Sequence, residues 1–244
     1  MRYDESRAAG YDAAHAARFA EAEAVVDALV GLLPPAGATR RALELGVGTG
    51  RLAIPLAARG VDVTGVDDSQ PMLDRLHHKH GGHRVHTVLG DFTGVDALVE
   101  GEFDLVFVAF NTLFELHDQE AQVQCVGGAA RHLAAGGAFV VEAIPPDLTR
   151  LEQTLTTLAV NERQAVLQAT RHEPESQRVW GADVTVGTDG SVLARPWSIR
   201  YVSVPELDLM CRLAGLHLRH RWGSWHGEPF TASSPVHVSV YGRR

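Results

Sequence analysis

Three glycines, Gly46, Gly48 and Gly50, alternate with other residues in the segment ALELGVGTG, which covers residues 42 to 50. Glycine adopts left-handed backbone conformations freely and leaves the main chain uncovered, so this loop can turn tightly and bring a ligand against bare peptide groups. A side chain at these positions would occupy the space that the ligand needs. The spacing therefore predicts a ligand-binding loop, with a plain tight turn as the alternative.

A carboxylate, Asp67, directly follows a second apolar segment, in the sequence VDVTGVDDS. Because an ionised carboxylate has only acceptor atoms, Asp67 can accept hydrogen bonds from both hydroxyls of a ribose. A strand before the glycine loop, a helix after it and an acid after the second strand together favour a ligand-binding loop over a plain turn.

The glycine spacing distinguishes two classes of enzyme. Rossmann oxidoreductases that bind nicotinamide or flavin cofactors have the pattern G-x-G-x-x-G, with the pyrophosphate at a helix N-terminus. Here the pattern is G-x-G-x-G, and Arg51 and Leu52 follow without a third glycine or alanine at the expected place. An NAD(P)-dependent oxidoreductase is therefore the less favoured alternative.

The chain resembles the class I S-adenosylmethionine (SAM)-dependent methyltransferases of small-molecule type over nearly its whole length. Their motif E/D-x-G-x-G-x-G is matched by residues 44 to 50. SAM has no pyrophosphate, which suits the compressed loop. The resemblance implies that Glu44 and the loop hold the methionine end of SAM and that Asp67 binds its ribose. It also implies that Ser69 and Met72 lie beside the adenine.

Two further segments carry the resemblance. The acidic-aromatic pair after the third strand is matched by Asp91 and Phe92, which the resemblance places at the adenine amino group and ring face. The strand-four motif is matched by residues 103 to 112, and its end, with Phe110, is expected to face the methyl donor. Asp68 departs from the family pattern, which usually has an apolar residue there.

The cofactor is therefore expected to be SAM, with S-adenosylhomocysteine as its product. Tyr3 and Tyr11 resemble the aromatic lid residues that small-molecule members close over SAM, although both could instead only pack an N-terminal helix. No metal is expected, because the histidines at 77, 78 and 80 lie on an outer helix. Neither they nor Cys211 show the paired ligand spacing of a zinc site.

Methyl transfer is a direct displacement, so a protein mainly aligns the reactants, and a general base helps only if the nucleophile must lose a proton. The candidate catalytic residues are Asn111, His117, Glu142 and His226; Asn111 and His117 lie with Glu115 at the expected mouth of the site, and His226 lies on a late loop rich in small residues. Asn111, Glu115 and His117 could also be polar residues at a helix start. Glu142 lies in the apolar segment VVEAIPP, so it either points into the site or pairs with an arginine.

The first half of the chain alternates strand and helix patterns, which predicts a parallel sheet with helices on both faces. Expected strands are 41–45, 61–66, 85–89, 105–109 and 138–143; expected helices are 22–33, 51–59, one capped at 68 or 69, and 119–133, the last ended by the glycines at 136 and 137.

The alternation of strand and helix patterns stops after the prolines at 145 and 146. A helix is expected at 148–158, then alternating segments at 163–170, 177–186 and 192–202, with a hairpin turn at 188–191. A helix at 205–214 and strands at 216–222 and 236–241 follow. The expected fold is α/β: a Rossmann-like seven-stranded methyltransferase sheet with an antiparallel β cap inserted after strand five. We expect a single domain, 1–244, with the cap insert at about 147–204.

The composition limits which classes of partner and which location are expected. The formal charge of −8, with thirteen histidines left neutral, argues against nucleic acid, whose binding relies on clustered Lys and Arg. No apolar run approaches the ~18 residues that span a membrane, the polar N-terminus lacks a signal-peptide core, and two cysteines make no disulfide framework, so a cytoplasmic protein is expected. A homodimer is a candidate assembly, because related capped methyltransferases are often dimers.

The sequence thus predicts methyl transfer from SAM to N, O or C of a small molecule, such as a natural-product intermediate. Aromatic residues of the cap, among them Trp180 and Trp197, form either core or the walls of the acceptor site. The alternatives are a SAM-binding enzyme of this fold that catalyses a non-methylating reaction such as cyclisation, and a non-catalytic SAM-binding module.

Overall fold

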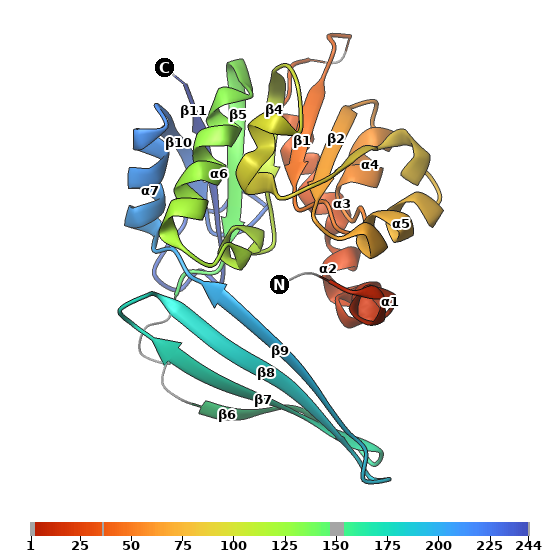
Figure 1. The fold of residues 1–244 in the computed structure, drawn as a ribbon. Helices are drawn as coiled ribbons and strands as arrows, with labels where there is room; N and C mark the ends of the chain where they lie inside the picture. The colour runs from red at the N-terminus through yellow and green to blue at the C-terminus, as the bar shows by residue number, and fades with distance from the viewer. Residues whose placement is uncertain (1–2, 36, 147–153, 244) are drawn as a thin grey trace.

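The computed structural model describes residues 3–35, 37–146 and 154–243. A seven-stranded sheet flanked by helices forms the core, and a four-stranded antiparallel sheet extends away from it (Figure 1). The predicted fold class is confirmed, including the antiparallel insert after the fifth strand.

The core sheet has the strand order β10-β11-β5-β4-β1-β2-β3. Its strands are β1 (Arg41–Leu45), β2 (Asp62–Asp67), β3 (His86–Leu89), β4 (Phe103–Val108), β5 (Leu133–Ala143), β10 (His217–Trp222) and β11 (His237–Gly242). β1 to β5 are parallel, and β11 is antiparallel to both of its neighbours. Short runs such as FDLVFV in β4 are almost entirely buried, as expected for strands covered on both faces.

Helices cover both faces of this sheet. They are α3 (Ala22–Gly31), α4 (Ala53–Ala58), α5 (Gln70–His78), α6 (Gln119–Arg131) and α7 (Val204–Leu213); the first two helices, α1 (Glu5–Ala14) and α2 (Ala16–Ala20), lie at the edge of the core. Apolar residues of α3, α4 and α5 form one core cluster with the sheet, and those of α6 and α7 form the other. Ser69 and Ser203 cap α5 and α7, each followed by a proline in the first turn, where proline does not disturb a helix.

The largest boundary difference from the prediction in the core lies between α6 and β5. α6 ends at Arg131 and β5 begins at Leu133, so the glycines at 136 and 137 lie inside the strand instead of ending the helix. Gly136 has φ +80°, and the pairing register of β4 and β5 shifts between the pairs Phe103↔Leu133 and Leu105↔Ala138. The glycines therefore accommodate an irregularity in the strand.

The insert, named the cap below, consists of β6 (Thr154–Val160), β7 (Gln164–Glu173), β8 (Arg178–Gly187) and β9 (Val192–Arg200). The helix expected at 148–158 is wrong for residues 154–158, which lie in β6; residues 148–153 are outside the described part. The segment TLTTLAV is rich in β-branched residues and pairs with β7 from Thr154↔Thr170 onward.

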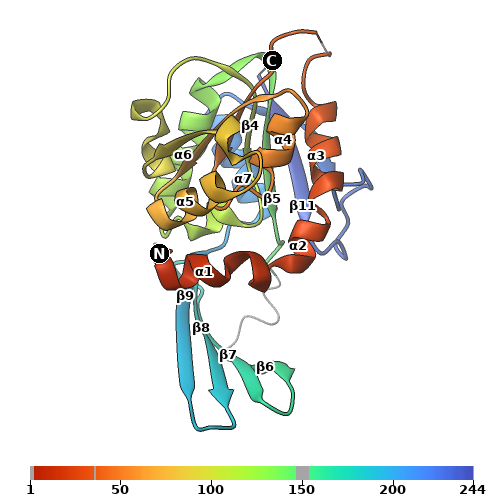
Figure 2. The same cartoon turned by 90° about the vertical axis from the view of Figure 1, so that its right-hand side faces the viewer.

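Helix α1 lies between the core and the cap (Figures 1 and 2). Its Glu5 carboxylate is 2.6 Å from Arg75 Nη2 of α5, and Arg7 Nη2 donates a 2.5 Å hydrogen bond to the carbonyl oxygen of Pro196 in β9. At the base of the cap, the buried Arg200 guanidinium lies 2.8 Å from the Glu206 carboxylate of α7. These contacts fix the cap and α1 against one edge of the core.

That edge is where the parallel strands end. The strand order reverses between β1 and β4, and in open α/β sheets ligands bind in the crevice at the carboxyl ends beside such a reversal. The glycine loop follows β1, and Phe110 follows β4, so both flank this point. In the described part of the chain, no helix is long and apolar enough to cross a membrane.

Candidate active site

The backbone of the loop after β1 favours glycine at three positions. Gly46, Gly48 and Gly50 have φ of +76°, +54° and +79°, in the left-handed region that side chains disfavour. A Cβ atom on Gly46 would lie 2.3 Å from Thr112 Cγ2, and one on Gly50 would lie 2.8 Å from Leu76 Cγ. The loop therefore presents main chain to its surroundings, and at Gly46 and Gly50 a side chain would also collide with its neighbours.

Asp67, at the end of β2, holds this loop in place. Its two carboxylate oxygens accept hydrogen bonds from the main-chain N–H groups of Gly48 (2.8 Å) and Ser69 (2.9 Å). Burial raises the pKa of Asp67, while the same two hydrogen bonds oppose the rise. The carboxylate thus lies where the glycine loop and the start of α5 meet.

Glu44, in β1, is a buried carboxylate with an unsatisfied oxygen. Only 5% of the residue is exposed, and its Oε2 has no hydrogen-bond partner among the described residues. Burial raises the pKa of Glu44 to about 8, and the nearby Arg51 guanidinium opposes this shift. Both side chains line a small cavity of about 30 Å³ together with the glycine loop, Tyr11 and Phe110.

The opposite wall of this cavity is the turn after β4. Phe110 and Asn111 have φ of +55° and +62°, which is rare for two successive residues other than glycine. The Phe110 N–H donates a 2.8 Å hydrogen bond to Glu142 Oε2, and Asn111 Oδ1 accepts one of 2.7 Å from the Ile144 N–H. The turn is therefore held by the end of β5. The sequence predicts that Glu142 either points into the site or pairs with an arginine. In the described chain its carboxylate instead accepts a hydrogen bond from main chain.

The N-terminal helices cover the cavity with aromatic rings. Ring centroids are 5.5 Å apart for Tyr3 and Tyr11, 4.6 Å for Tyr11 and His15, and 5.2 Å for His15 and Phe110. The Arg18 guanidinium lies 5.1 Å from the centroid of the Phe110 ring. Burial raises the pKa values of both tyrosines and lowers that of His15. These rings form a continuous cover from α1 to the turn after β4.

Ion pairs and hydrogen bonds hold this cover down. Asp12 Oδ1 accepts a 2.6 Å hydrogen bond from the Thr49 hydroxyl of the glycine loop, and Asp12 Oδ2 lies 2.5 Å from Lys79 Nζ. The Ser69 hydroxyl donates a 2.6 Å hydrogen bond to the carbonyl oxygen of Tyr3. Helix α1 is therefore attached to both loops that flank the cavity.

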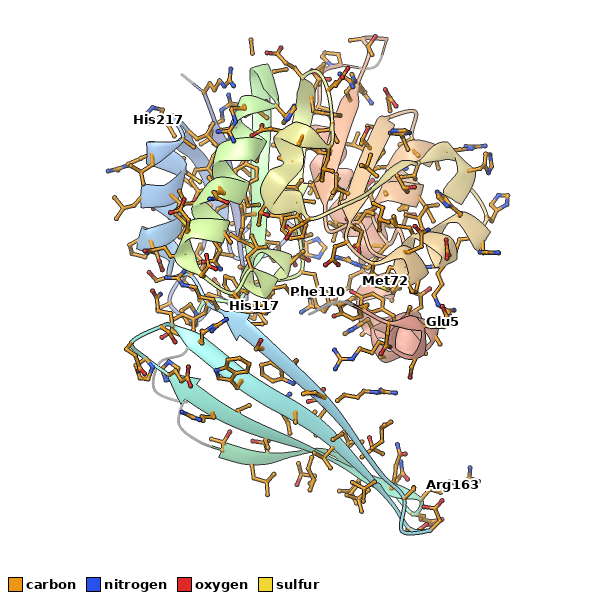
Figure 3. The ribbon with its side chains drawn as sticks, in the orientation of Figure 1. Glu5, Met72, Phe110, His117, Arg163 and His217 are labelled. Carbon is orange, nitrogen blue, oxygen red and sulfur yellow. The ribbon has the colours of Figure 1, made fainter. Side chains whose placement is uncertain are left out.

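The residues expected beside the adenine lie on the α5 side of the loop. Met72 is buried, and its Cε would be 3.4 Å from a Cβ on Gly48; Figure 3 shows Met72 and Phe110 along the same edge of the core. Ser69 is also buried and accepts the Met72 N–H as a helix cap. Asp91 is exposed and accepts from the N–H and hydroxyl of Thr93, while Phe92 is half-buried against the core.

Two further cavities lie between α1 and the cap. The outer cavity, of about 330 Å³, is lined on the α1 side by Tyr11 and His15 and on the cap side by Asp183 and Arg195. The inner cavity, of about 170 Å³, is lined by Glu115, Ser198 and Ile199. Both are also lined by Tyr3, Arg7 and Trp197, so they adjoin each other.

The candidate bases differ in position. His117 lies beside the base of β9 (Figure 3), with Nδ1 3.5 Å from the Ser198 hydroxyl, and burial lowers its pKa. Glu115 is mostly buried and lines the inner cavity, and burial raises its pKa to about 7. His226 is exposed on the loop between β10 and β11 and lines none of the three cavities described above. The structure thus brings Glu115 and His117 toward the cap and leaves His226 apart.

Some residues at the site carried no sequence signal. Arg51, Asp12 and His15 reach the cavity or its cover from positions that follow no motif, and Asp183 lies in the middle of a strand of the cap. Only the position of Arg51, directly after the glycine loop, could have suggested a role. No group of three or more His, Cys, Asp or Glu side chains able to hold a metal ion occurs in the described residues.

Comparisons with known proteins match this architecture. A family described as "Methyltransferase domain" matches residues 42–137, the part that holds the glycine loop and Asp67. The cypemycin N-terminal methyltransferase of a Streptomyces species is 31% identical over 208 residues, which are 84% of each chain.

Solved structures share the fold with its cap. The CcbJ methyltransferase of Streptomyces caelestis has a TM-score of 0.83 and 38% identity, over 91% of this chain and 89% of its own. CalS10, a SAM-bound amino pentose methyltransferase of Micromonospora echinaspora, has a TM-score of 0.69 over 96% of both chains. At 20% identity, the similarity to CalS10 shows only that the fold is shared.

Proposed function

The chain belongs to the class I SAM-dependent methyltransferases and methylates a small molecule, and from this premise we propose that its acceptor atom is an amine nitrogen. The observation that carries the proposal is the pair of cavities between α1 and the cap, where Glu115 and Asp183 place carboxylates against the rings of Tyr3 and Trp197. Carboxylates and aromatic faces both attract a cationic amine. The cypemycin enzyme, named for an amino-terminal acceptor, supports the same chemistry.

The residues around the small cavity fit SAM. The unsatisfied Glu44 oxygen and the Arg51 guanidinium complement the ammonium and carboxylate of an amino acid, because a bound ammonium favours the ionised form of Glu44. We propose that these two side chains and the loop of Gly46, Gly48 and Gly50 hold the methionine end. When bound, SAM supplies a methyl group already activated on a sulfonium, so we propose a reaction that needs no metal ion.

The other proposed contacts follow the positions on α5 and β4. Asp67 would bind the ribose; Ser69, Met72, Asp91 and Phe92 would surround the adenine. Tyr11 and Phe110 would cover the methyl end, since both line the small cavity. Asn111 and Glu142 would act by holding the turn that carries Phe110, since each bonds main chain there.

The remaining partners are also proposals. Exposed apolar side chains gather on the cap, among them Leu155, Val160 and Leu193, and support a homodimer formed through this sheet. The net charge of −8 supports a partner other than nucleic acid or an anionic membrane. The buried free thiols Cys125 and Cys211 support a reducing, cytoplasmic location.

The test is product analysis with trideuteromethyl-labelled SAM. The protein is incubated with peptides that have a free or an acetylated amino terminus, and with amino sugars and their hydroxyl counterparts. We expect the label on nitrogen, release of S-adenosylhomocysteine, and loss of the product on acetylation. Label found only on oxygen or carbon would refute the nitrogen acceptor. A rearranged product without S-adenosylhomocysteine would instead favour the cyclisation alternative.

A further inference from the structure

Glu115 lies where the cofactor side and the cap side of the site meet. It ends the short 3-10 helix Thr112–Glu115, which directly follows the turn of Phe110 and Asn111. Its side chain lines the inner cavity with Trp197 and Ser198 of β9. On the cofactor side, the negative charge of Glu115 raises the pKa values of Tyr3 and Tyr11, and the charge of Asp67 raises the pKa of Glu115. No other candidate base in the described part of the site connects both sides in this way.

Charges of both signs surround Glu115. Burial is the largest cause that raises its pKa, and the carboxylates of Asp67 and Asp68, at the end of β2, add to the rise; the amino terminus of the chain and a hydrogen bond donated by the Tyr3 phenol oppose it. From the cap side it faces uncharged residues, Trp197, Ser198 and Ile199, and from α1 it faces Arg7, which also bonds Pro196 O. His117 follows two residues on. A cation that enters the inner cavity therefore meets one carboxylate, that of Glu115, on the core side, with the Arg7 guanidinium on the α1 side.

We propose that Glu115 is a catalytic residue that binds the protonated amine of the acceptor and takes its proton. This inference rests on the proposed nitrogen acceptor. The ammonium N–H bond breaks, its electron pair stays on nitrogen, and the proton goes to a Glu115 oxygen. The nitrogen lone pair then forms the N–CH₃ bond as the methyl–sulfur bond of the sulfonium breaks with its electrons on sulfur. A methylated ammonium and a neutral thioether result, so charge and atoms balance.

The shape of the cavities defines the acceptor further. Tyr3 and Trp197 belong to both cavities, so the group that carries the amine would lie between these two rings. Asp183 lines the outer cavity, with Oδ1 accepting from Trp197 Nε1 at 3.3 Å and from Gln168 Nε2 at 3.0 Å. The outer cavity has the volume of ordinary small-molecule sites. The acceptor class is therefore a primary or secondary amine on a compact ring or apolar group, with a polar extension toward Asp183 and Arg195.

The first test measures binding, without turnover. Benzylamine and benzyl alcohol are titrated calorimetrically into the wild-type protein saturated with S-adenosylhomocysteine, and into Glu115→Gln and Glu120→Gln, the last a control on the exposed start of α6. Wild type and control should prefer the amine, and Glu115→Gln should lose about 10-fold or more of its affinity, as for loss of a charged hydrogen-bond partner. Equal amine preference in all three proteins overturns the inference.

The second test measures the pH profile with whichever amine is methylated fastest in the panel above. Because proton transfer requires the carboxylate form, kcat/KM of the wild type should rise through an inflection near pH 7. Glu115→Gln should lose the inflection and about 100-fold or more of the rate. Tyr3→Phe removes the donor that stabilises the carboxylate, so its inflection should move to higher pH. An unmoved inflection in both variants overturns the inference.

The two proposals fail in different ways. A wild-type protein that methylates only oxygen or carbon refutes the proposed nitrogen acceptor, whatever Glu115 does. A protein that methylates nitrogen, with Glu115→Gln as active as wild type across the pH range, refutes only the role of Glu115.

Discussion

The main-chain N–H of Phe110 donates a 2.8 Å hydrogen bond to the carboxylate of Glu142, across the ends of two adjacent parallel strands. Phe110 needs this support because its φ of +55° is unfavourable for an aromatic residue. A carboxylate near the end of the apolar strand β5 is thereby accounted for: it satisfies a main-chain donor and sets where the Phe110 ring lies.

Replacement of Glu142 separates this supporting role from a catalytic one. Glu142→Gln keeps an oxygen that can accept the Phe110 N–H, so SAM affinity and turnover should stay within ~3-fold of wild type. Glu142→Ala leaves the donor unsatisfied, a loss of ~1–3 kcal/mol, and should weaken SAM binding by about 10-fold. Calorimetric titration with SAM measures both. Loss of turnover in Glu142→Gln with unchanged SAM affinity would instead make Glu142 a catalytic group.

Alanine at Gly46 tests the glycine loop, with Gly60→Ala as its control. Both glycines have strongly positive φ, +76° and +79°, so alanine strains the backbone of both by ~1 kcal/mol. Only at Gly46 would the new Cβ also meet a side chain, Thr112 Cγ2 at 2.3 Å; at Gly60 nothing lies within 4 Å.

Gly46→Ala should therefore lower the free energy of unfolding by more than the control does. It should also weaken SAM binding by about 10-fold or more, while Gly60→Ala leaves that affinity unchanged. Denaturant unfolding and calorimetry provide the two measurements. Equal SAM affinities for the two variants would show that the loop tolerates a side chain, contrary to its proposed role.

The sequence predicts the first half of the fold well because its signals are local. The glycine loop, Asp67 and the cap of α5 at Ser69 lie within 25 consecutive residues, each followed or preceded by a regular apolar pattern. The prediction for β6 is wrong because pairing with β7, and not the pattern of its own residues, makes this segment a strand. All of its residues are exposed, so no buried face marks it in the sequence.

The site beyond the loop depends on contacts between distant positions. Arg7 meets Pro196 across 189 positions, and this contact brings α1 to the cap and bounds both cavities. Sequence patterns carry no signal for such a distant contact, so the sequence alone does not distinguish Glu115 from His226. The hydrogen-bond partner of Glu142 could not be predicted for a related reason. The donor is a main-chain N–H, and because every residue except proline has one, the sequence does not mark it.

The ion pair of Asp12 and Lys79 should control the exchange of SAM. The cavity beneath Tyr11 and Phe110 is small, about 30 Å³, and the rings of the cover close it, so we expect α1 to move when SAM enters. Asp12→Ala removes the bonds to Lys79 and Thr49 that hold α1 down. The loss of ~1–2 kcal/mol from the closed state should raise the association rate of SAM up to about 10-fold.

Stopped-flow measurement of tryptophan fluorescence follows this association. Asp27→Ala is the control, because it breaks an ion pair with Arg59 (2.7 Å) between α3 and α4, away from the cover. The control should leave the association rate at the wild-type value. An equal rate in Asp12→Ala would mean that the cover does not limit entry.

Glu44→Gln should stabilise the protein at high pH and weaken its binding of SAM. The folded pKa of about 8 lies above the ordinary value of 4.5, so the stability linked to protonation is present below pH 4.5 and is lost as pH rises through 8. Glutamine has no charge to form in the buried site. The variant should therefore gain up to ~4 kcal/mol over wild type at pH 8.5, a rise in Tm of up to roughly 8–16 °C, and much less at pH 4.5.

Calorimetric scans of the ligand-free protein across this pH range measure the gain, and Glu162→Gln, on an exposed turn of the cap, should show no pH-dependent difference from wild type. SAM affinity should fall by about 10-fold or more, because the ammonium of the methionine end loses its charged partner. A Tm difference that is the same at pH 4.5 and pH 8.5 would show that Glu44 does not titrate in this range. Unchanged SAM affinity would move the methionine end away from Glu44.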